Sequence, residues 1–381
     1  MQTLAVKKEK RIHRFGEFDL LKALAILGLP AVHILEEGMC SNVVSDGVTS
    51  LESVIVALCI LGPSVFMICM GFSMGGTRSS SYSLMKQGFR FLFLGAVLNI
   101  LRWLLPGILL YVFEGDSLVK HFGFCLASDI YFFVGFFCLF YALIRKLNMK
   151  TPALIVTSIV MLTVNTLLTP LTAKLDLHVI LESLLGNIVY ISDSSCFPLL
   201  SWAIFPSIGI VLGDVLKKVD DGHRQSLMNR MIVFSPLVFV SFFVFLWSYD
   251  FDLLKVLVSP LNEYVTDLPN VVLTVALALF LFGVLYYVCK AIDKSRFMAF
   301  MAKIATYIVP FYVLQWLLVS WLIVGLDLFN LEMNLGWFLL SVAAITGICI
   351  YVSIKHGLKF SKFLARMTSF KIKRKKRRIE K

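Results

Sequence analysis

Residues 18–36 read FDLLKALAILGLPAVHILE, and this stretch decides the class of fold. Its length is close to the ~20 residues that a helix needs to cross a bilayer. The stretch lacks a small-x-small cleavage site and is followed by a second acid, Glu37, so it does not have the pattern of a cleaved signal peptide. We therefore expect a membrane-spanning helix near the start of the chain.

The composition of the whole chain agrees with a membrane protein. Apolar residues make up 59% of the 381 residues, charged residues make up 16%, and the mean hydropathy is +0.85. Soluble domains carry roughly 45–50% apolar and about 25% charged residues, so a soluble globular fold is excluded. Intrinsic disorder is excluded because disordered chains have low hydrophobicity. The expected fold class is an all-α polytopic membrane protein with about ten transmembrane helices.

Apolar stretches of suitable length recur along the chain. The expected spans are residues 18–36, 53–75, 89–112, 122–144, 152–170, 196–216, 231–249, 270–289, 303–325 and 335–355. With the N-terminus in the cytoplasm, Lys and Arg gather in the inner loops and acids in the outer loops, which is the positive-inside pattern. An even number of spans then places both termini in the cytoplasm. The protein is expected to be a multi-pass protein of the cell membrane.

The chain is expected to divide into one transmembrane domain, 1–355, and a basic cytoplasmic juxtamembrane tail, 356–381. Residues 176–191 are apolar but short, and they are expected to form an interfacial or re-entrant helix on the outer side. The net charge of +12 comes from basic clusters at the two ends of the chain. Such clusters beside apolar spans contact anionic lipids, so lipids are the expected partners of the tail and nucleic acid is not expected.

Charged residues inside the first span are costly in hydrocarbon and mark a candidate functional site. At about 100° per residue, Lys22 and His33 lie within about 20° on one helix face, with Asp19 within about 60° of Lys22. This stripe is expected to face the bundle interior or a water-filled cavity. His33 lies about 22 Å along the helix from Phe18, and Pro30 predicts a kink below it. The alternative is an interfacial histidine, with Asp19 and Lys22 as a snorkelling pair.

Three further spans carry polar residues at depth. In the third span, Asn99 and Arg102 share a face, and Arg102 is too deep to be a simple inner-surface anchor. The fourth span reaches Asp129 at similar depth, so we expect a buried Arg102–Asp129 ion pair, which does not exclude a role in orienting a polar substrate. In the ninth span, Gln315 needs a hydrogen-bond partner and serves either as packing glue or as part of a site.

Other chemistries have no support in the sequence. It contains no phosphate-binding loop and no serine-hydrolase elbow. Its eight cysteines show no Cys/His ligand spacing, so no metal is expected. The candidate chemistry therefore rests on the polar residues within the spans.

The order of these features resembles the ten-span membrane acyltransferases: acyltransferase family 3 and its relatives of the heparan-alpha-glucosaminide N-acetyltransferase type. The first span is similar to the family signature D-x-x-R-G-x-A…H, with matching residues at Asp19, Lys22, Ala25 and His33. Further similar stretches follow in the expected order, at 63–73, 88–106, 128–130, 197–213 and 307–316. Two departures stand out. Lys22 replaces an arginine and so loses bidentate binding of carboxylate or phosphate, and Gln315 replaces a histidine.

The resemblance implies acyl transfer across the membrane. Cytoplasmic acyl-CoA, with acetyl-CoA as the expected donor, would supply the acyl group to an extracytoplasmic sugar, glycan or lipid-linked acceptor. His33 would act as general base, because an imidazole titrates near neutral pH. Asp19 and Lys22 complete the expected catalytic set, where they brace the helix or meet the donor.

The expected substrate-binding residues extend this set. Arg102 would stabilise negative charge on the acyl oxygen, and the CoA phosphates would be held by a basic group on the inner side. That inner group is Arg78, Lys86 and Arg90, for which ordinary positive-inside topology is an equal explanation. The remaining members of the expected set are Asn99, Asp129 and Gln315.

Two other classes remain open from the sequence. In a transporter or flippase for a polar lipid or small solute, the same intramembrane charges would line the translocation path. In a non-catalytic scaffold, the departures at Lys22 and Gln315 would have removed the chemistry. Dependence on acyl-CoA separates the acyltransferase from both alternatives.

Overall fold

The computed structural model describes residues 15–50, 62–77, 79–115, 117–127, 129–172, 174–192, 195–248 and 268–367. Within these ranges the chain is helical apart from turns, loops and one isolated β-bridge between Val44 and Met333. Nine helical stretches of the described residues are long and apolar enough to cross a membrane. The expected all-α polytopic membrane fold is therefore confirmed.

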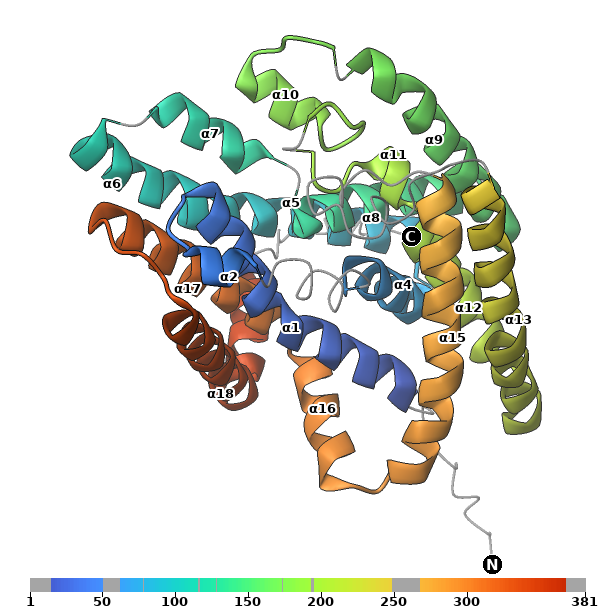
Figure 1. The fold of residues 1–381 in the computed structure, drawn as a ribbon. Helices are drawn as coiled ribbons and strands as arrows, with labels where there is room; N and C mark the ends of the chain where they lie inside the picture. The colour runs from blue at the N-terminus through green and yellow to red at the C-terminus, as the bar shows by residue number, and fades with distance from the viewer. Residues whose placement is uncertain are drawn as a thin grey trace, which may run out of the picture.

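Figure 1 shows how the helices are arranged, and their order along the chain is as follows. The first half contains α1 (Gly16–Cys40), α2 (Asp46–Thr49), α4 (Gly62–Met74), α5 (Ser81–Asn99), the π-helical turn η1 (Ile100–Leu104), α6 (Leu105–Glu114), α7 (Leu118–Leu126), α8 (Ile130–Lys146) and α9 (Thr151–Thr172). The helices after α9 are α10 (Val179–Leu185), α11 (Leu199–Trp202), α12 (Ile204–Leu216), α13 (Asp221–Ser248), α15 (Leu268–Ile292), α16 (Arg296–Thr306), α17 (Ile308–Leu328) and α18 (Leu335–Met367).

Helix α1 runs through the middle of the bundle (Figure 1). It packs against α4, α15, α16, α17 and α18. At its N-terminal end, Phe18 stacks on Phe72 of α4 at a centroid distance of 3.6 Å and on Phe282 of α15 at 4.4 Å. The helix continues past Pro30 to Cys40. This central position explains why the polar stripe of the first span faces protein rather than lipid.

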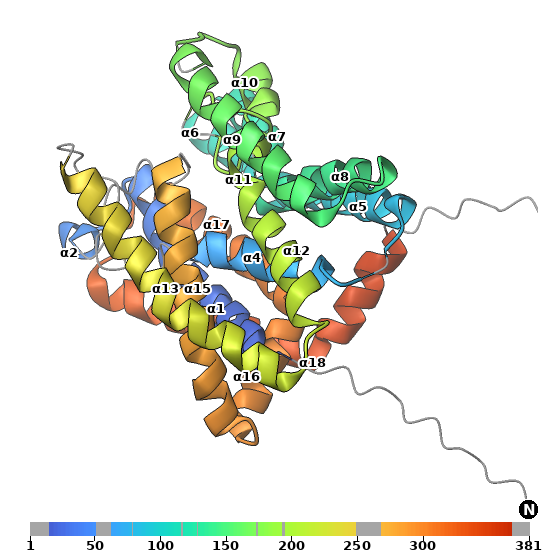
Figure 2. The same ribbon diagram turned by 90° about the vertical axis from the view of Figure 1, so that its right-hand side faces the viewer.

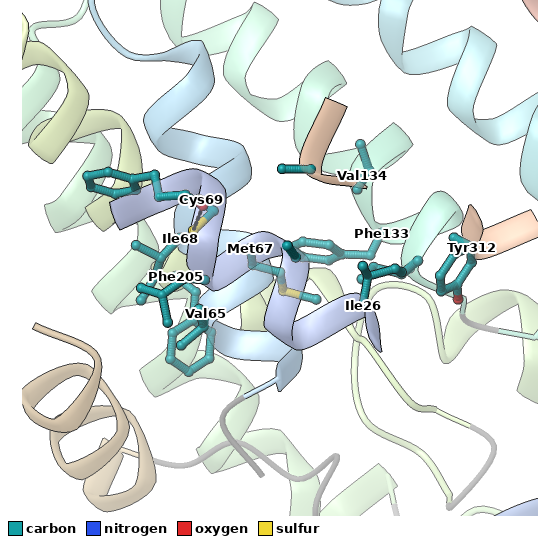
Figure 3. Packing of buried hydrophobic residues seen from close by; sticks show 14 of the residues in the cluster. Ile26, Val65, Met67, Ile68, Cys69, Phe133, Val134, Phe205 and Tyr312 are labelled. Atoms are coloured by element: carbon teal, nitrogen blue, oxygen red, sulfur yellow. Dashed lines mark hydrogen bonds between the residues drawn. The ribbon is translucent and has the colours of Figure 1, made fainter. Parts of the chain in front are cut away.

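Apolar side chains from several helices form the core beside α1. Figure 3 shows Met67 of α4 next to Phe133 of α8, with Ile26 of α1 and Tyr312 of α17 close by. Ile26, Met67 and Phe133 are fully buried. These contacts bring α1 and α17 together although they lie at opposite ends of the chain.

Helices α4 and α12 approach each other through glycines. A Cβ added to Gly71 would lie 2.0 Å from the carbonyl oxygen of Pro206. A Cβ added to Gly209 would likewise lie 2.0 Å from the carbonyl oxygen of Ile68. Only glycine fits at these two positions, as is common where membrane helices pack closely.

Helix α13 lies at the edge of the molecule, side by side with α15 (Figures 1 and 2). Its outward face exposes large apolar side chains, such as Phe234 and Leu237. Hydrocarbon chains are as apolar as these side chains, so a bilayer covers this face without penalty. The edge position of α13 thus agrees with a protein embedded in lipid.

Three expected spans are interrupted. In the span 196–216, helix begins at Leu199 and is divided between α11 and α12 at Ala203. The span 122–144 is not one helix, because α7 ends at Leu126 and α8 begins at Ile130. The carboxylate of Asp129 accepts a hydrogen bond from the backbone N–H of Tyr131 and caps α8 at its start. The span 303–325 is divided between α16 and α17 at Tyr307. Pro310 explains this break, since it has no N–H and its ring clashes with the carbonyl four residues earlier.

Three other expectations differ from the structure or extend beyond it. In the expected second span, 53–75, the structure describes only the part from residue 62, which forms the 13-residue helix α4. The outer helix expected at 176–191 is limited to the seven residues of α10. Helix α18 continues past residue 355 to Met367, and residues 368–381 lie outside the described residues. The division into domain and tail therefore stays a prediction.

Candidate functional site

The imidazole of His33 meets the amide of Gln315 inside the bundle. His33 Nδ1 lies 3.1 Å from Oε1 and 3.0 Å from Nε2 of Gln315. His33 is 8% exposed and Gln315 is fully buried. The partner that Gln315 requires is thus the histidine of the first span, brought to it by the packing of α1 on α17.

Trp316, the residue after Gln315, joins this pair to Arg102. The imidazole of His33 stacks on the indole of Trp316 at a centroid distance of 3.8 Å and an interplanar angle of 18°. The guanidinium carbon of Arg102 lies 4.1 Å from the centroid of the same indole, which is within the range of a cation–π interaction. Trp316 therefore contacts both His33, the candidate base, and Arg102.

Arg102 and Asp129 form the buried ion pair expected from the sequence. Arg102 Nη2 lies 3.0 Å from Asp129 Oδ2, and both side chains are almost fully buried. The hydroxyl of Tyr312 donates to the same carboxylate oxygen at 3.2 Å, and the N–H of Tyr131 donates to the other at 2.8 Å. The carboxylate thus has partners on both oxygens, as a buried charge requires. Tyr312 lies one turn before Trp316 on α17.

The π-helical turn η1 places Arg102 within this group. The carbonyl of Leu101 in the turn accepts a hydrogen bond from the indole N–H of Trp321 at 3.2 Å. Just before the turn, Asn99 donates to the carbonyl of Cys125 at 3.2 Å and so ties α5 to α7. Single π-helical turns are rare and frequently occur at functional sites. We call the group formed by His33, Arg102, Asp129, Tyr312, Gln315 and Trp316 the histidine cluster.

Several polar atoms in and beside the histidine cluster have no partner among the described residues. They are Nε and Nη1 of Arg102, Nε1 of Trp316 and Oδ1 of Asn99. A buried donor without an acceptor is costly, and each such atom needs an explanation. A substrate oxygen that accepts hydrogen bonds from the unpaired N–H groups of Arg102 would explain why these donors are buried without a protein partner.

The structure places Asp19 and Lys22 away from the histidine cluster. Lys22 and His33 are separated by about 17 Å along α1 at 1.5 Å per residue. Lys22 Nζ donates to Ser73 Oγ of α4 at 3.0 Å, and Asp19 is half-buried in the turn before it. The three residues expected to be catalytic therefore lie at two places on α1.

A second lysine lies close to Lys22. Lys217 Nζ donates to the carbonyl oxygens of Phe72 at 2.7 Å and Gly75 at 2.6 Å, which caps the C-terminal end of α4. Burial lowers the pKa of Lys217, and the charge of Lys22 lowers it further. The end of α4 thus carries two ammonium groups near enough to repel each other, at the depth where the sequence places the inner surface.

Of the three expected phosphate-binding residues, the structure describes Lys86 and Arg90, both on α5. Arg78 lies outside the described residues. Lys86 and Arg90 are half-buried on α5, which packs mainly against α8. Arg90 lies about 18 Å along the helix axis from Arg102 at 1.5 Å per residue. Their assignment to the donor stays a prediction.

Sequence reasoning missed one buried ion pair near the start of α1. Arg224 Nη2 of α13 lies 2.5 Å from Glu17 Oε1, with side chains 11% and 2% exposed. The guanidinium also lies 4.3 Å from the ring centroid of Phe15 and 5.1 Å from that of Tyr286. The sequence did carry a signal for this pair, because Glu17 is an acid at the end of the first span where basic residues gather. The pair anchors the edge helix α13 to α1.

The fold and the buried cluster together define a polytopic membrane protein with an imidazole, a guanidinium and a carboxylate inside its helical bundle. A family model described as an acyltransferase domain, that of acyltransferase family 3, matches residues 15–354. The chain belongs to this family and is a membrane acyltransferase in the general sense. Comparisons with curated proteins and with solved structures gave no match.

Proposed function

We propose that this protein transfers an acyl group, in the first place acetyl, from cytoplasmic acyl-CoA to an acceptor on the other side of the cell membrane. The acceptor is a hydroxyl or amine of a sugar, a glycan or a lipid-linked saccharide. Family membership supports acyl transfer. The contact between His33 and Gln315 is the observation that carries the further assignment.

His33 is the general base in this proposal. When Gln315 Oε1 accepts a hydrogen bond from Nδ1–H, the other ring nitrogen, Nε2, carries the lone pair. Nε2 then takes the proton of the acceptor hydroxyl, and the acceptor oxygen attacks the thioester carbonyl. Collapse of the tetrahedral adduct breaks the carbon–sulfur bond, and the imidazolium returns the proton to the leaving thiolate. Atoms and charge balance without any further reactant.

Arg102 stabilises the oxyanion that forms during this attack. Its Nη2 is engaged by Asp129, whereas its Nε and Nη1 have no partner among the described residues. Fixed donors in a site without water stabilise developing charge far more than donors in solution do. Asp129 and Tyr312 keep the guanidinium in place, and Trp316 holds it beside the imidazole.

The donor enters from the inner side, where Lys22 lies. Lys22 uses one of its protons for Ser73, which leaves two for phosphate oxygens of CoA. Arg78, Lys86 and Arg90 are the further cations proposed for this end of the donor. Asp19 and Lys22 therefore act in donor binding in this account, about three helical turns from the base.

Thioester cleavage by the purified protein tests the proposal. Detergent-purified wild type, incubated with acetyl-CoA and a crude envelope extract as acceptor, is expected to release free CoA thiol. His33→Ala is expected to lose 10²-fold or more of this rate, because general-base catalysis contributes typically 10²–10⁴-fold. His223→Ala is the matched control, since that histidine is largely exposed and pairs with Asp220.

Each outcome separates the proposed classes. Equal rates for wild type and His33→Ala would show that His33 is not the base. If the protein does not cleave acetyl-CoA and its melting temperature Tm does not rise with acetyl-CoA, the acyl-CoA donor is excluded. That outcome favours transport through the histidine cluster. A rise in Tm without cleavage would establish donor binding and leave the acceptor as the missing reactant.

A further inference from the structure

The last helix, α18, is longer than a bilayer is thick. Its 33 residues make about 50 Å of helix, whereas the hydrocarbon core takes up ~20 residues, or about 30 Å. Counted from Leu335, a helix of that length leaves the hydrocarbon near residue 355. The C-terminal part of α18 therefore continues into the headgroup layer and beyond.

The cations of α18 begin where the helix leaves the hydrocarbon. Residues 335–354 contain no charged side chain, and the whole helix contains no Asp or Glu. Lys355, Lys359 and Lys362 follow, all of them exposed. Their spacing of four and three residues puts them within about 60° on one face at 100° per residue. We call these three residues the basic stripe.

The face of α18 opposite the basic stripe packs on protein. Gly357, about 160° from Lys355, is buried, and a Cβ there would lie 2.6 Å from the ring of Tyr307. Ser353 is 2% exposed, and Phe360 packs against the core. The C-terminal end of α18 thus packs against Tyr307, the residue between α16 and α17. The basic stripe on the opposite face points away from the bundle.

Apolar side chains flank the basic stripe. Leu358 is 56% exposed and Phe363 is 55% exposed. Tyr351, one turn before Lys355, is 58% exposed, and its hydroxyl accepts a hydrogen bond from Lys355. Exposed aromatic and leucine side chains next to lysines are typical of a surface at the membrane interface. A soluble acidic partner would leave these apolar side chains unexplained.

We propose that the basic stripe binds the headgroups of anionic phospholipids in the leaflet at the C-terminal end of α18. Lysines near an anionic leaflet are attracted to its headgroups, and three lysines on one face act together. Leu358 and Phe363 enter the boundary between headgroups and acyl chains on either side. This inference does not depend on acyl transfer.

Lipid titration of the full chain tests this inference. The detergent-purified protein is titrated with phosphatidylglycerol or with phosphatidylcholine of the same acyl chains, and bound lipid is counted by native mass spectrometry. The wild type is expected to bind phosphatidylglycerol more tightly. The variant K355Q/K359Q/K362Q is expected to lose at least about fivefold in apparent affinity for phosphatidylglycerol, the factor that 1 kcal/mol represents. Its binding of phosphatidylcholine should not change.

Two further variants keep the result unambiguous. K146Q/K150Q/K174Q removes the same charge from exposed lysines that are not gathered on one helix face, and its affinity for phosphatidylglycerol is expected to fall less than that of the stripe variant. K355R/K359R/K362R keeps the charge and should also bind normally, which separates charge from damage to the helix. An unchanged affinity of the stripe variant, or an equal loss in the control, would overturn the proposal. If glycerol phosphate binds the basic stripe as tightly as phosphatidylglycerol does, the ligand is a soluble anion and the lipid proposal is overturned.

Discussion

His33 and Gln315 are 282 residues apart in the chain, and their side chains meet at hydrogen-bond distance in the buried centre of the protein. The contact requires that α1 and α17 pack against each other, so it depends on the complete bundle. In the proposed mechanism this contact gives Gln315 a chemical role. When its Oε1 accepts a hydrogen bond from Nδ1–H of His33, Nε2 is left as the nitrogen that takes the proton.

Replacing Gln315 tests this role. Gln315→Leu keeps a similar volume but removes the acceptor for His33 Nδ1. Loss of such a buried hydrogen bond costs on the order of 1–3 kcal/mol, so kcat for thioester cleavage should fall by about fivefold or more. KM for acetyl-CoA should stay near the wild-type value, because the proposed binding mode places the donor phosphates towards Lys22.

The control for that substitution is Gln225→Leu. Gln225 lies on α13 and accepts a hydrogen bond from Lys290 at 3.4 Å on an exposed surface. Its replacement should leave kcat and KM unchanged. A wild-type kcat in Gln315→Leu would contradict the assignment of Gln315 to the orientation of His33.

The Arg102–Asp129 pair should show strong energetic coupling. Removing one partner of a buried ion pair costs about 3–5 kcal/mol because the other charge is left without compensation. Arg102→Met and Asp129→Leu should therefore each lower Tm in detergent more than the double variant does. Thermal unfolding of the four proteins in one detergent measures this coupling. Additive losses in the double variant would show that the two side chains do not stabilise each other.

The packing of α4 on α12 should tolerate no side chain at Gly209. Gly209→Ala would put a Cβ 2.0 Å from the carbonyl oxygen of Ile68, and a backbone atom cannot move aside without shifting a helix. We expect a large fall in Tm. Gly325→Ala in α17 is the matched control, because nothing lies within 4 Å of its added Cβ. That control should raise stability by about 0.5–1 kcal/mol. Similar Tm values for both variants would contradict the close packing.

The ion pair between Glu17 and Arg224 should anchor α13. Glu17→Gln leaves the buried guanidinium without its carboxylate and is expected to cost about 3 kcal/mol. Limited proteolysis should then cut between α12 and α13 faster than in wild type. Glu332→Gln, which changes an exposed acid, should behave as wild type. Equal proteolysis of Glu17→Gln and wild type would show that other contacts hold α13.

The sequence was sufficient to predict the class of fold and one contact of the cluster. Span length and hydropathy predicted the all-α membrane bundle, because hydrocarbon leaves few alternatives for the backbone. The Arg102–Asp129 pair was predictable for a similar reason, since a charge at that depth needs an opposite charge. The break at Asp129 was not predicted, although an acid before an apolar run is a known start signal for helices.

The centre of the histidine cluster could not be predicted from spacing. The π-helical turn at Arg102 departs from the regular 100° per residue on which helix-face arguments rest. The stacking of His33 and Arg102 on Trp316 depends on how α17 is rotated against its neighbours. Glu17 and Arg224 lie far apart in sequence at the ends of two spans, where many charges compete as partners.

The most direct test of the central claim is acyl transfer in sealed vesicles. Protein with a uniform orientation would be reconstituted with labelled acetyl-CoA on the side of the basic clusters and envelope extract on the opposite side. The account predicts labelled acceptor on the opposite side with wild type and His223→Ala, and at least 10²-fold less with His33→Ala. Label confined to the donor side, or full transfer by His33→Ala, would contradict it.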